Sequence, residues 1–581
     1  MTATEIGALV RAASLSELRA AGRLVANVGG HTLCLFAEGD AVHAVDNRCP
    51  HMGFPLNRGS VADGILTCHW HHARFDLCSG GTFDQWADDL RRFPVELRGD
   101  DVYVDVAPRV DRVAHQRKRL RDGLERNIPL VLAKATITLT ESDPTGVEAF
   151  AAGLAFGVER RGDGWGRGLT TLTCFMNLVP WLDAADVPVA LYHGLADVGA
   201  EGADEPPRFP LDPLPSTGPD VSALGRWFRR FVEVRDAEGA ERALVSAVRA
   251  GASPTELADM LFAAATDHRY LDSGHALDFV SKALEALDVV GWEHAEAVLA
   301  SLPLQIASAE RMEESNAWRN PVDLVELLDS AFERIPALGA GNAGGSGWSR
   351  RSELVELVLG DDPAACIDAM LEALREDAGG VELASAVSFA AANRIARFPT
   401  TNEFSDWDTA LHTFTFANAV EQGLRRSPSR ELLRGVFDAA MSVYLDRFLN
   451  VPATRLPLPT RPADTNTLLD DLSLVFDRQQ EVDEAGTLVA SFLARGGDSD
   501  RLVSVLGAAL TREDRNFHTI QCVEASVRQS ELLRGTEAAR LPLIAAARYL
   551  AAHAPTSRSQ RQTFDIARRL HRGERLYEEV A

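Results

Sequence analysis

The sequence lacks any apolar run long enough to cross a bilayer, and it also lacks the uninterrupted apolar core of a secretory leader. Glu5, Arg11 and Glu17 break up the apolar positions near the N-terminus. We therefore expect no membrane partner and a cytoplasmic location.

Cysteine and basic residues are also scarce. Seven cysteines in 581 residues are too few and too scattered for a disulfide framework. The 59 lysines and arginines are outnumbered by 84 aspartates and glutamates, and the resulting formal charge of −25 repels phosphate backbones. We therefore expect no nucleic acid partner.

The length implies at least two domains, and the pattern of apolar residues changes near Pro108. Before this point, short segments alternate apolar and polar residues between Gly, Asp and Asn, as strands do: 31–39, 41–47, 64–70, 73–81 and 100–106. Beyond it, long stretches such as 256–271 and 275–290 have helical periodicity. This predicts a small all-β domain at 1–107, a connecting helix or linker at 108–135 and a large all-α domain at 136–581.

Three segments of the helical part are unsuited to regular structure or to an obvious motif. The Pro-rich segment 206–215 and the Gly-rich segment 339–348 are predicted surface loops. The segment GDGWGRG at 162–168 is similar to a phosphate loop, but no strand precedes it and no Lys-Ser/Thr follows it. We expect no nucleotide there.

The helical part also contains a diverged internal repeat. The segments 257–268, 383–394 and 502–513 share a Leu-x3-Leu/Val start and an Ala-rich continuation. A second helix is predicted after each, with a histidine near its start: His275, His412 and His518. A fourth unit has His193 after the apolar segment 169–182. The unequal spacing predicts an old helical duplication with insertions rather than a regular solenoid.

Two short loops of the β domain carry metal-ligand residues. Cys49-Pro50-His51 and Cys68-His69-Trp70-His71 form a C-x-H and C-x-x-H pair. Two thiolates on one iron and two imidazoles on another give a cluster with less negative charge and a higher potential than an all-cysteine cluster. Zinc accepts the same ligands, but a zinc finger places its cysteines together and its histidines together, whereas here each loop has one of each.

The surrounding segments CPHMGFPL and CHWHHARFDLCSGG resemble the cluster loops of Rieske ferredoxins and of the Rieske domains of ring-hydroxylating oxygenases. The resemblance implies a [2Fe–2S] cluster with Cys49 and Cys68 on one iron and His51 and His71 on the other. It also implies a tight loop at Gly53 and Pro55 whose backbone amides point at the sulfurs.

At several positions near the cluster loops, this sequence differs from one or another group of Rieske proteins. Respiratory-chain Rieske proteins have an additional cysteine in each loop. This sequence has Phe54 and Trp70 near those places, so the resemblance implies the lower-potential, ferredoxin-like subtype. His72 stands where Rieske ferredoxins usually have glycine, and we expect His69 and His72 to face solvent. Cys78 follows too late to be a ligand and is a predicted buried structural thiol.

The segment DHRYLDSGH is the densest group of ligand-type residues in the helical part. On one continuous helix, His268, Asp272 and His275 would share a face, and two histidines with one carboxylate suit a non-haem ferrous site. Alternatively, Ser273-Gly274 ends one helix and His275 opens the next. Ordinary Rieske oxygenases have a D-x2-H-x4-H signature, but Val280 stands at its last position, which disfavours their fold here.

The recurring histidines extend this hypothesis to a shared site. Repeated helices packed about one axis would direct their histidines inward, with Asp272 as the anionic ligand or the group that orients a ligand. The candidate second iron site therefore comprises His193, His268, Asp272, His275, His412 and His518. A haem held by one of these histidines is an alternative, and so is a separate capping or packing role for each.

A second resemblance concerns the segment LYHGLADVGAE and the later AAATDH with its further histidine. These segments resemble questin-oxidase-like proteins, which are helical enzymes associated with oxygen-dependent ring opening of aromatic polyketides. The second histidine of the family's H-x-x-H-type element is replaced here. The resemblance implies a small organic, aromatic substrate.

Two functions follow from these expectations. In the first, the chain is an oxidoreductase, a monooxygenase or related oxygenase, in which an external reductase or ferredoxin charges the cluster and the cluster reduces a second iron. In the second, it is a non-catalytic electron carrier or sensor whose helical domain binds a protein. The basic run at 117–121 is a predicted solvated helix face, or else a docking patch for an acidic electron donor.

Overall fold

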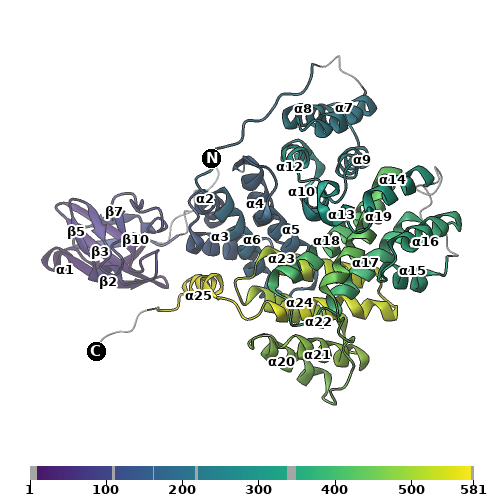
Figure 1. Cartoon of the computed structure of the whole chain (residues 1–581). Helices are drawn as coiled ribbons and strands as arrows, with labels where there is room; N and C mark the ends of the chain where they lie inside the picture. The colour runs from purple at the N-terminus through teal and green to yellow at the C-terminus, as the bar shows by residue number, and fades with distance from the viewer. Residues whose placement is uncertain (1–8, 108–110, 161, 216–219, 336–347, 577–581) are drawn as a thin grey trace. The chain divides into compact units, whose positions relative to one another are not determined.

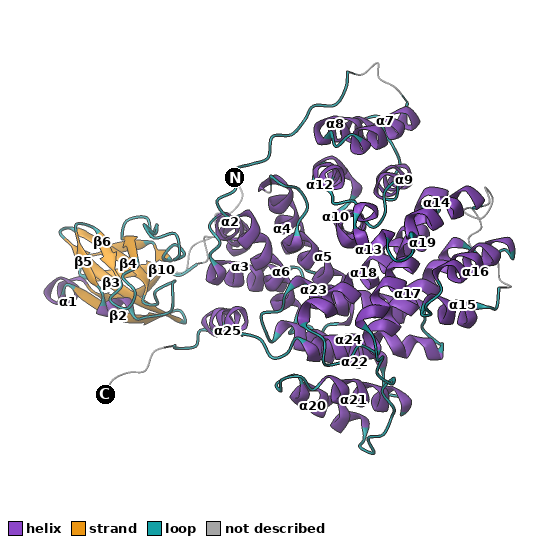
Figure 2. Cartoon of the chain, viewed as in Figure 1, coloured by secondary structure: helices purple, strands orange, loops and turns teal. Residues whose placement is uncertain are grey.

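A computed structural model describes residues 9–107, 111–160, 162–215, 220–335 and 348–576. The strands lie in the N-terminal part and the rest of the described chain is helical (Figure 2). The predicted fold class, a small all-β domain followed by a large helical region, is confirmed. The chain divides into two compact units, Met1–Ser142 with Gln562–Ala581, and Asp143–Arg561.

The β part of the first unit is the purple segment in Figure 1. It consists of three small antiparallel sheets, ordered β1-β10-β9, β2-β3-β4-β8 and β5-β6-β7. The strands are β1 (Leu9–Ser14), β2 (Arg23–Val28), β3 (His31–Glu38), β4 (Ala41–Asp46), β5 (Ser60–Ala62), β6 (Ile65–Thr67), β7 (Arg74–Asp76), β8 (Arg92–Phe93), β9 (Val95–Arg98) and β10 (Asp101–Asp105). Each segment predicted to form a strand contains one.

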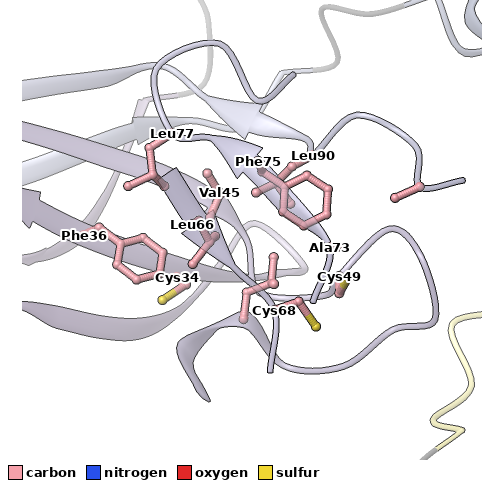
Figure 3. Close-up of a cluster of buried hydrophobic side chains, with 12 residues drawn as sticks. Cys34, Phe36, Val45, Cys49, Leu66, Cys68, Ala73, Phe75, Leu77 and Leu90 are labelled. Carbon is pink, nitrogen blue, oxygen red and sulfur yellow. The ribbon is translucent and has the colours of Figure 1, made fainter. Parts of the chain in front are cut away.

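Strand β3 separates two hydrophobic cores. Successive side chains of a strand point to opposite faces. Leu33 and Leu35 therefore enter one core, with Leu18 of helix α1 (Leu15–Ala21), whereas Cys34 and Phe36 enter the other. The second core also contains Cys49 and Cys68, which Figure 3 shows among its apolar side chains. The cluster loops are thus attached to a core rather than to a mobile surface.

Two further helices of this unit cover the predicted linker, α2 (Arg112–Glu125) and α3 (Pro129–Ser142), and they pack on each other. The basic run lies on α2, where Arg117, Lys118 and Arg121 are exposed as expected. The prediction is wrong for Arg119, which is buried. Its guanidinium donates to Asp88 Oδ1 at 2.8 Å, because a buried arginine needs a carboxylate partner.

The regular secondary structure in the described part of the second unit is helical. Its helices are α4 (Val147–Arg160), α5 (Arg167–Leu178), α6 (Val187–Gly202), α7 (Val221–Glu233), α8 (Ala237–Arg249), α9 (Pro254–Ala265), α10 (His275–Val290), α11 (Ala295–Leu299), α12 (Pro303–Ser308), α13 (Asn316–Arg319), α14 (Leu324–Arg334), α15 (Arg351–Val358), α16 (Pro363–Arg375), α17 (Gly380–Ala396), α18 (Phe404–Arg426), α19 (Arg430–Asp446), α20 (Thr465–Val475), α21 (Val482–Ala494), α22 (Ser499–Thr511), α23 (Phe517–Leu532) and α24 (Arg540–Ala552). Helix α25 (Ser559–His571) follows.

Helices α10, α18 and α23 form the centre of the second unit. Helix α18 packs against both α10 and α23, and α5 packs against these same two helices. All four carry small or apolar residues at most of their buried positions, so their backbones come close. Among the described residues, none of the helices is both long and apolar enough to span a membrane.

The loops and repeat segments follow most of the expectations. Residues 206–215 lack regular structure, whereas 339–347 lie outside the described residues. In the segment 162–168, Trp165 is buried and its indole donates to Thr170 Oγ1 at 3.0 Å, a structural turn rather than a phosphate loop. The repeat segments fall on α9, α17 and α22, and the duplication itself stays a prediction.

The predicted position of the histidines within their helices is correct for two of the three repeats. His275 opens α10 and His518 is the second residue of α23. The prediction is wrong for His412, which lies two turns inside α18. Helix α18 starts earlier because Glu403 and Asp406 form a capping box at its N-terminus.

We predict that residues 1–107 expressed alone fold and hold the [2Fe–2S] cluster, because both cores of the β domain are built from residues 18–104. The measurements are the visible absorption spectrum and the content of iron and sulfide. The fragment 1–142, which adds α2 and α3, is the matched control. A soluble 1–107 fragment that holds no iron, beside a 1–142 fragment that does, would show that the domain extends beyond residue 107.

Candidate metal centres

The first candidate centre is formed by two loops of the β domain. In the loop after β4, the Cys49 amide donates to Phe54 O and the Gly53 amide donates to Cys49 O, both at 2.8 Å. Gly53 has φ +79°, a left-handed conformation that glycine adopts without strain. In the loop between β6 and β7, the Cys68 amide donates to Ala73 O at 2.8 Å. Each loop is therefore closed by its own backbone around one ligand pair.

The four predicted ligands come together at the ends of these loops. Cys49 and Cys68 are buried free thiols joined by a hydrogen bond. The rings of His51 and His71 lie 4.9 Å apart, edge to face. The buried Nδ1 atom of His51 has no hydrogen-bond partner in the described part of the chain. Two thiols, two imidazoles and an unpartnered ring nitrogen fit a histidine-ligated cluster.

The local environment favours the metal-binding forms of Cys68 and His51, whereas the hydrogen bond with Cys68 and burial raise the pKa of the Cys49 thiol. The pKa of the Cys68 thiol is lowered, first by the hydrogen bond from Cys49 and then by the amides of Trp70 and His71, although burial opposes this. Burial lowers the pKa of His51 to about 4, so the imidazole is neutral near pH 7. Thiolates and neutral imidazoles are the forms that bind metal. The amides directed at the sulfurs lie two and three residues after each cysteine, at His51 and Met52 and at Trp70 and His71, whereas the sequence analysis expected such amides only in the first loop.

Such a site, on a small all-β scaffold, defines a histidine-ligated iron–sulfur domain for electron transfer. Residues 8–94 match the family model described as the Rieske [2Fe-2S] domain. The N-terminal part of this chain therefore belongs to the Rieske family. The family model covers only this part, and the similarity of the helical part to questin-oxidase-like proteins stays a prediction.

The relatives include proteins of very different size. The ferredoxin component of an alkene monooxygenase system from Xanthobacter autotrophicus is 31% identical over 85 residues, which are 14% of this chain and 70% of the relative. Human apoptosis-inducing factor 3 is 33% identical over 78 residues, 13% of either chain. The solved ferredoxin of carbazole 1,9a-dioxygenase from Nocardioides aromaticivorans is 26% identical and covers 17% of this chain and 96% of its own, with a TM-score of 0.16.

The residues near the ligands are arranged partly as expected. His69 and His72 are exposed, and His72 has φ +62°, which explains why glycine is usual at this position. The prediction of a buried thiol is wrong for Cys78, which is exposed. It lies in the turn after β7, where its amide donates to Asp76 Oδ1 at 3.0 Å, and the turn directs its side chain outward.

A lysine that the sequence analysis did not select contacts the first cluster loop. Lys134 of α3 donates to Pro50 O at 2.6 Å and to His51 O at 2.9 Å, and its Nζ lies 3.6 Å from Asp88 Oδ2. Burial lowers the pKa of Lys134, while Asp88 opposes this. Its position 83 residues from His51 in the chain left no local signal of this contact.

The second candidate centre lies in the helical unit, where His275, His412 and His518 converge from α10, α18 and α23. Their ligand atoms all lie within 4.8 Å of one another. The Nε2 atoms of His412 and His518 are 2.9 Å apart. Two nitrogens bound to one metal ion at a right angle are about 3 Å apart, given metal–nitrogen bonds of about 2.1 Å. The group therefore has the residue types and spacing of a metal site.

Burial and mutual proximity favour the neutral form of two of these imidazoles. Burial, followed by the neighbouring imidazoles, lowers the pKa of His275 to about 3 and that of His412 to about 4. A neutral imidazole offers a lone pair to a metal. His275 and His412 are thus in the binding state at neutral pH.

The sequence analysis expected Asp272 to orient a ligand histidine. In the structure, the carboxylate that lies beside one of the three histidines is that of Asp408. Its Oδ2 lies 3.4 Å from His518 Nδ1, and its Oδ1 accepts a hydrogen bond from the Tyr549 hydroxyl. Burial opposes its ionisation, but the nearby rings of His518 and His553 and the hydrogen bond from Tyr549 hold its pKa well below the usual range. A carboxylate on the far nitrogen of a ligand histidine fixes the ring and raises its basicity.

The other three candidates do not join this group. His193 is buried in α6, next to Phe175 and Tyr192. His268 lies between Glu233 and Glu313, with both contacts at 2.7 Å. The carboxylate of Asp272 accepts from the Glu310 amide at 2.7 Å.

The backbone conformation of the segment DHRYLDSGH explains why His268 and Asp272 do not share a helix face with His275. Tyr270, Asp272 and Ser273 have positive φ and form a 3-10 turn, η3 (Leu271–Gly274), so no continuous helix joins His268 to His275. The alternative expectation, that His275 opens a new helix, is the correct one.

A buried polar seam runs on from the histidines along α10 and α23. Gln521 donates to Asp278, one turn beyond His275 and His518. Further on, Lys282 Nζ lies 3.0 Å from Glu285 Oε2 and 2.8 Å from Glu524 Oε2. The sequence analysis missed these residues. Their signal was the recurrence of polar residues every three or four positions in otherwise apolar helices.

We predict that Cys49→Ser removes the paramagnetic signal of the reduced cluster, because serine does not replace a thiolate on iron. The control is Cys78→Ser, which changes an exposed thiol outside the ligand set. The measurement is electron paramagnetic resonance of the reduced protein, with iron and sulfide content. A complete signal in Cys49→Ser would exclude Cys49 as a ligand, and one zinc without sulfide in the unaltered protein would exclude the cluster.

We also predict that Lys134→Gln lowers the midpoint potential of the cluster, because a positive charge beside the His51 loop favours the more negative, reduced state. The shift expected from losing about 1 kcal/mol is on the order of 40 mV for one electron, with Asp88 offsetting part of it. Lys118→Gln removes the same charge from an exposed position of α2 and is the control. Equal potentials in all three proteins would mean that Lys134 has only a structural role.

Proposed function

We propose that this chain is an oxidoreductase of the oxygenase class, in which the Rieske domain supplies electrons to a second metal, iron, held by His275, His412 and His518. The single observation that carries the proposal is the convergence of three imidazoles from three helices, with Asp408 behind one of them. A chain that combines such a site with an electron-transfer domain is suited to redox catalysis. Iron held by these residues would supply the chemistry of oxygen activation.

The relatives support the part played by the Rieske domain. The Xanthobacter relative is named as the ferredoxin component of an oxygenase system. By analogy, we propose that the present domain receives electrons from an external reductase or ferredoxin. His71 is exposed whereas His51 is partly buried, so electrons are exchanged at the His71 side of the cluster.

The protein's own residues provide the rest of the proposed mechanism. The three imidazoles would hold the metal, and a site with three protein ligands would allow oxygen and substrate to bind as well. Asp408 lies 3.4 Å from His518 Nδ1 and would keep the opposite nitrogen, Nε2, directed toward a bound metal. The buried ion pairs of Lys282 with Glu285 and Glu524 lie further along the same helices and would hold α10 and α23, and so His275 and His518, in place.

We predict that His275→Ala, His412→Ala and His518→Ala each lower the iron content that exceeds the two irons of the cluster, while the Rieske signal is retained. His268→Ala is the control, because His268 lies outside the group. Asp408→Asn is expected to weaken iron binding about 10–100-fold, the usual effect of losing such a partner. The measurements are iron per chain and the visible spectrum, which would also reveal a haem.

The alternative function is a redox carrier or sensor without a catalytic centre. It predicts only the iron of the cluster in the unaltered protein purified without oxygen. Unchanged metal content in all three histidine variants would likewise favour it over an oxygenase.

A further inference from the structure

A cavity of about 200 Å³ borders the three-histidine group. His412 forms part of its wall, and so do Tyr270 and Ser273, which precede His275 by a few residues. The remaining wall comes from α13, α18, α19 and the segments beside them. A compound bound here therefore lies next to a proposed metal ligand.

The cavity has the size and lining of a site for one aromatic ring. Trp318 is 2% exposed, and its ring centroid lies 6.0 Å from that of Tyr270. Tyr270 in turn contacts Phe416 edge to face at 5.0 Å. An apolar cavity of about 150 Å³ binds benzene, so this one has room for a single ring with a small substituent. It is too small for a fused three-ring polyketide.

One polar group in the wall lacks a partner. Asp446 is 4% exposed, and its side chain hydrogen-bonds with Thr413, whose hydroxyl lies 3.4 Å from the Tyr270 hydroxyl. The other carboxyl oxygen, Oδ2, is buried and has no hydrogen-bond partner in the part of the chain that the structure describes. A buried oxygen without a partner is costly, so a polar group on a ligand is its natural complement.

We propose that the cavity between Tyr270 and Asp446 binds a neutral single-ring aromatic compound with a hydroxyl group, a phenol, whose oxygen hydrogen-bonds with Asp446. The ring of the ligand packs against the aromatic wall, and its hydroxyl group hydrogen-bonds with the carboxyl group of Asp446. As a substrate assignment this rests on the proposed function, because it places the ring beside the metal at His412. As a binding site it stands on the cavity alone.

The charge state of the wall agrees with a neutral ligand. Burial raises the pKa of Asp446 to about 8, although Thr413 and Arg394 oppose this. A neutral carboxyl both donates and accepts a hydrogen bond, as a phenol does. A carboxylate ligand would bring an uncompensated charge to an apolar wall.

The test is calorimetric titration of the full-length protein with phenol, benzene and a hydroxyanthraquinone. We expect saturable binding of phenol and benzene and at least tenfold weaker binding of the three-ring compound. Asp446→Leu, which keeps the branching of the side chain but removes the carboxyl, is expected to weaken phenol binding about tenfold and to leave benzene binding unchanged. Equal loss of phenol affinity and benzene affinity in this variant, or no loss of either, would overturn the role of Asp446.

A second variant keeps the test valid if Asp446→Leu does not fold. Ala317 lines the cavity from an exposed position, so Ala317→Trp is expected to abolish binding of both small compounds while the Rieske signal stays. No saturable phenol binding to the unaltered protein, or undiminished binding to Ala317→Trp, would overturn the site itself.

Titrations before and after removal of the non-cluster metal separate this inference from the proposed function. Phenol binding without any iron at the three histidines would support the cavity and contradict the oxygenase. Iron at the three histidines without phenol binding would contradict the cavity assignment and leave the oxygenase standing.

Discussion

The ammonium group of Lys282, held between the carboxylates of Glu285 and Glu524, fixes α10 against α23. All three side chains are buried, and a buried charge that loses its partner costs about 3–5 kcal/mol. Sliding one helix along the other would break these pairs, so the relative register of the two helices is set. His275 and His518 lie at the N-terminal ends of the same helices, so this register also fixes their positions relative to each other.

The same constraint operates in the first unit, at Asp88. This carboxylate pairs with Arg119 of α2 and lies near Lys134 of α3, and both helices lie outside the residues that the Rieske family model matches. Burial opposes its ionisation, but Lys134 and Arg119 hold the pKa of Asp88 below its usual range. Lys134 also donates to the carbonyl oxygen of His51, so these charged groups are connected to the first cluster loop. In this protein the cluster loop is therefore supported by helices added to the Rieske domain.

The cluster site could be predicted from the sequence because its ligands lie within two short loops, each closed by local hydrogen bonds. A C-x-H and a C-x-x-H motif need no knowledge of distant packing. The predictions for Cys78 and Arg119 were wrong because the exposure of these side chains is not set by local sequence. Whether Cys78 faces inward, and whether Arg119 meets solvent, depends on groups that lie elsewhere in the chain.

The helical site was predicted in part. Recurrence of a histidine after similar helices selected His275, His412 and His518, and these are the residues that the structure brings together. The same reasoning also selected His193, His268 and Asp272, which have other partners, and it overlooked Asp408. One turn separates Asp408 from His412, but nothing in the local pattern marks it as the partner of a histidine on another helix.

The sequence by itself determined the order of a β domain and a helical domain, most element positions, and the four cluster ligands, because periodicity and short motifs act over a few residues. Only the tertiary structure decided which histidines meet, which carboxylate orients them, and which cavity lies beside them. Those features depend on the packing of helices separated by more than a hundred residues in the chain. Helix periodicity indicates which face is buried, but not which neighbour covers it.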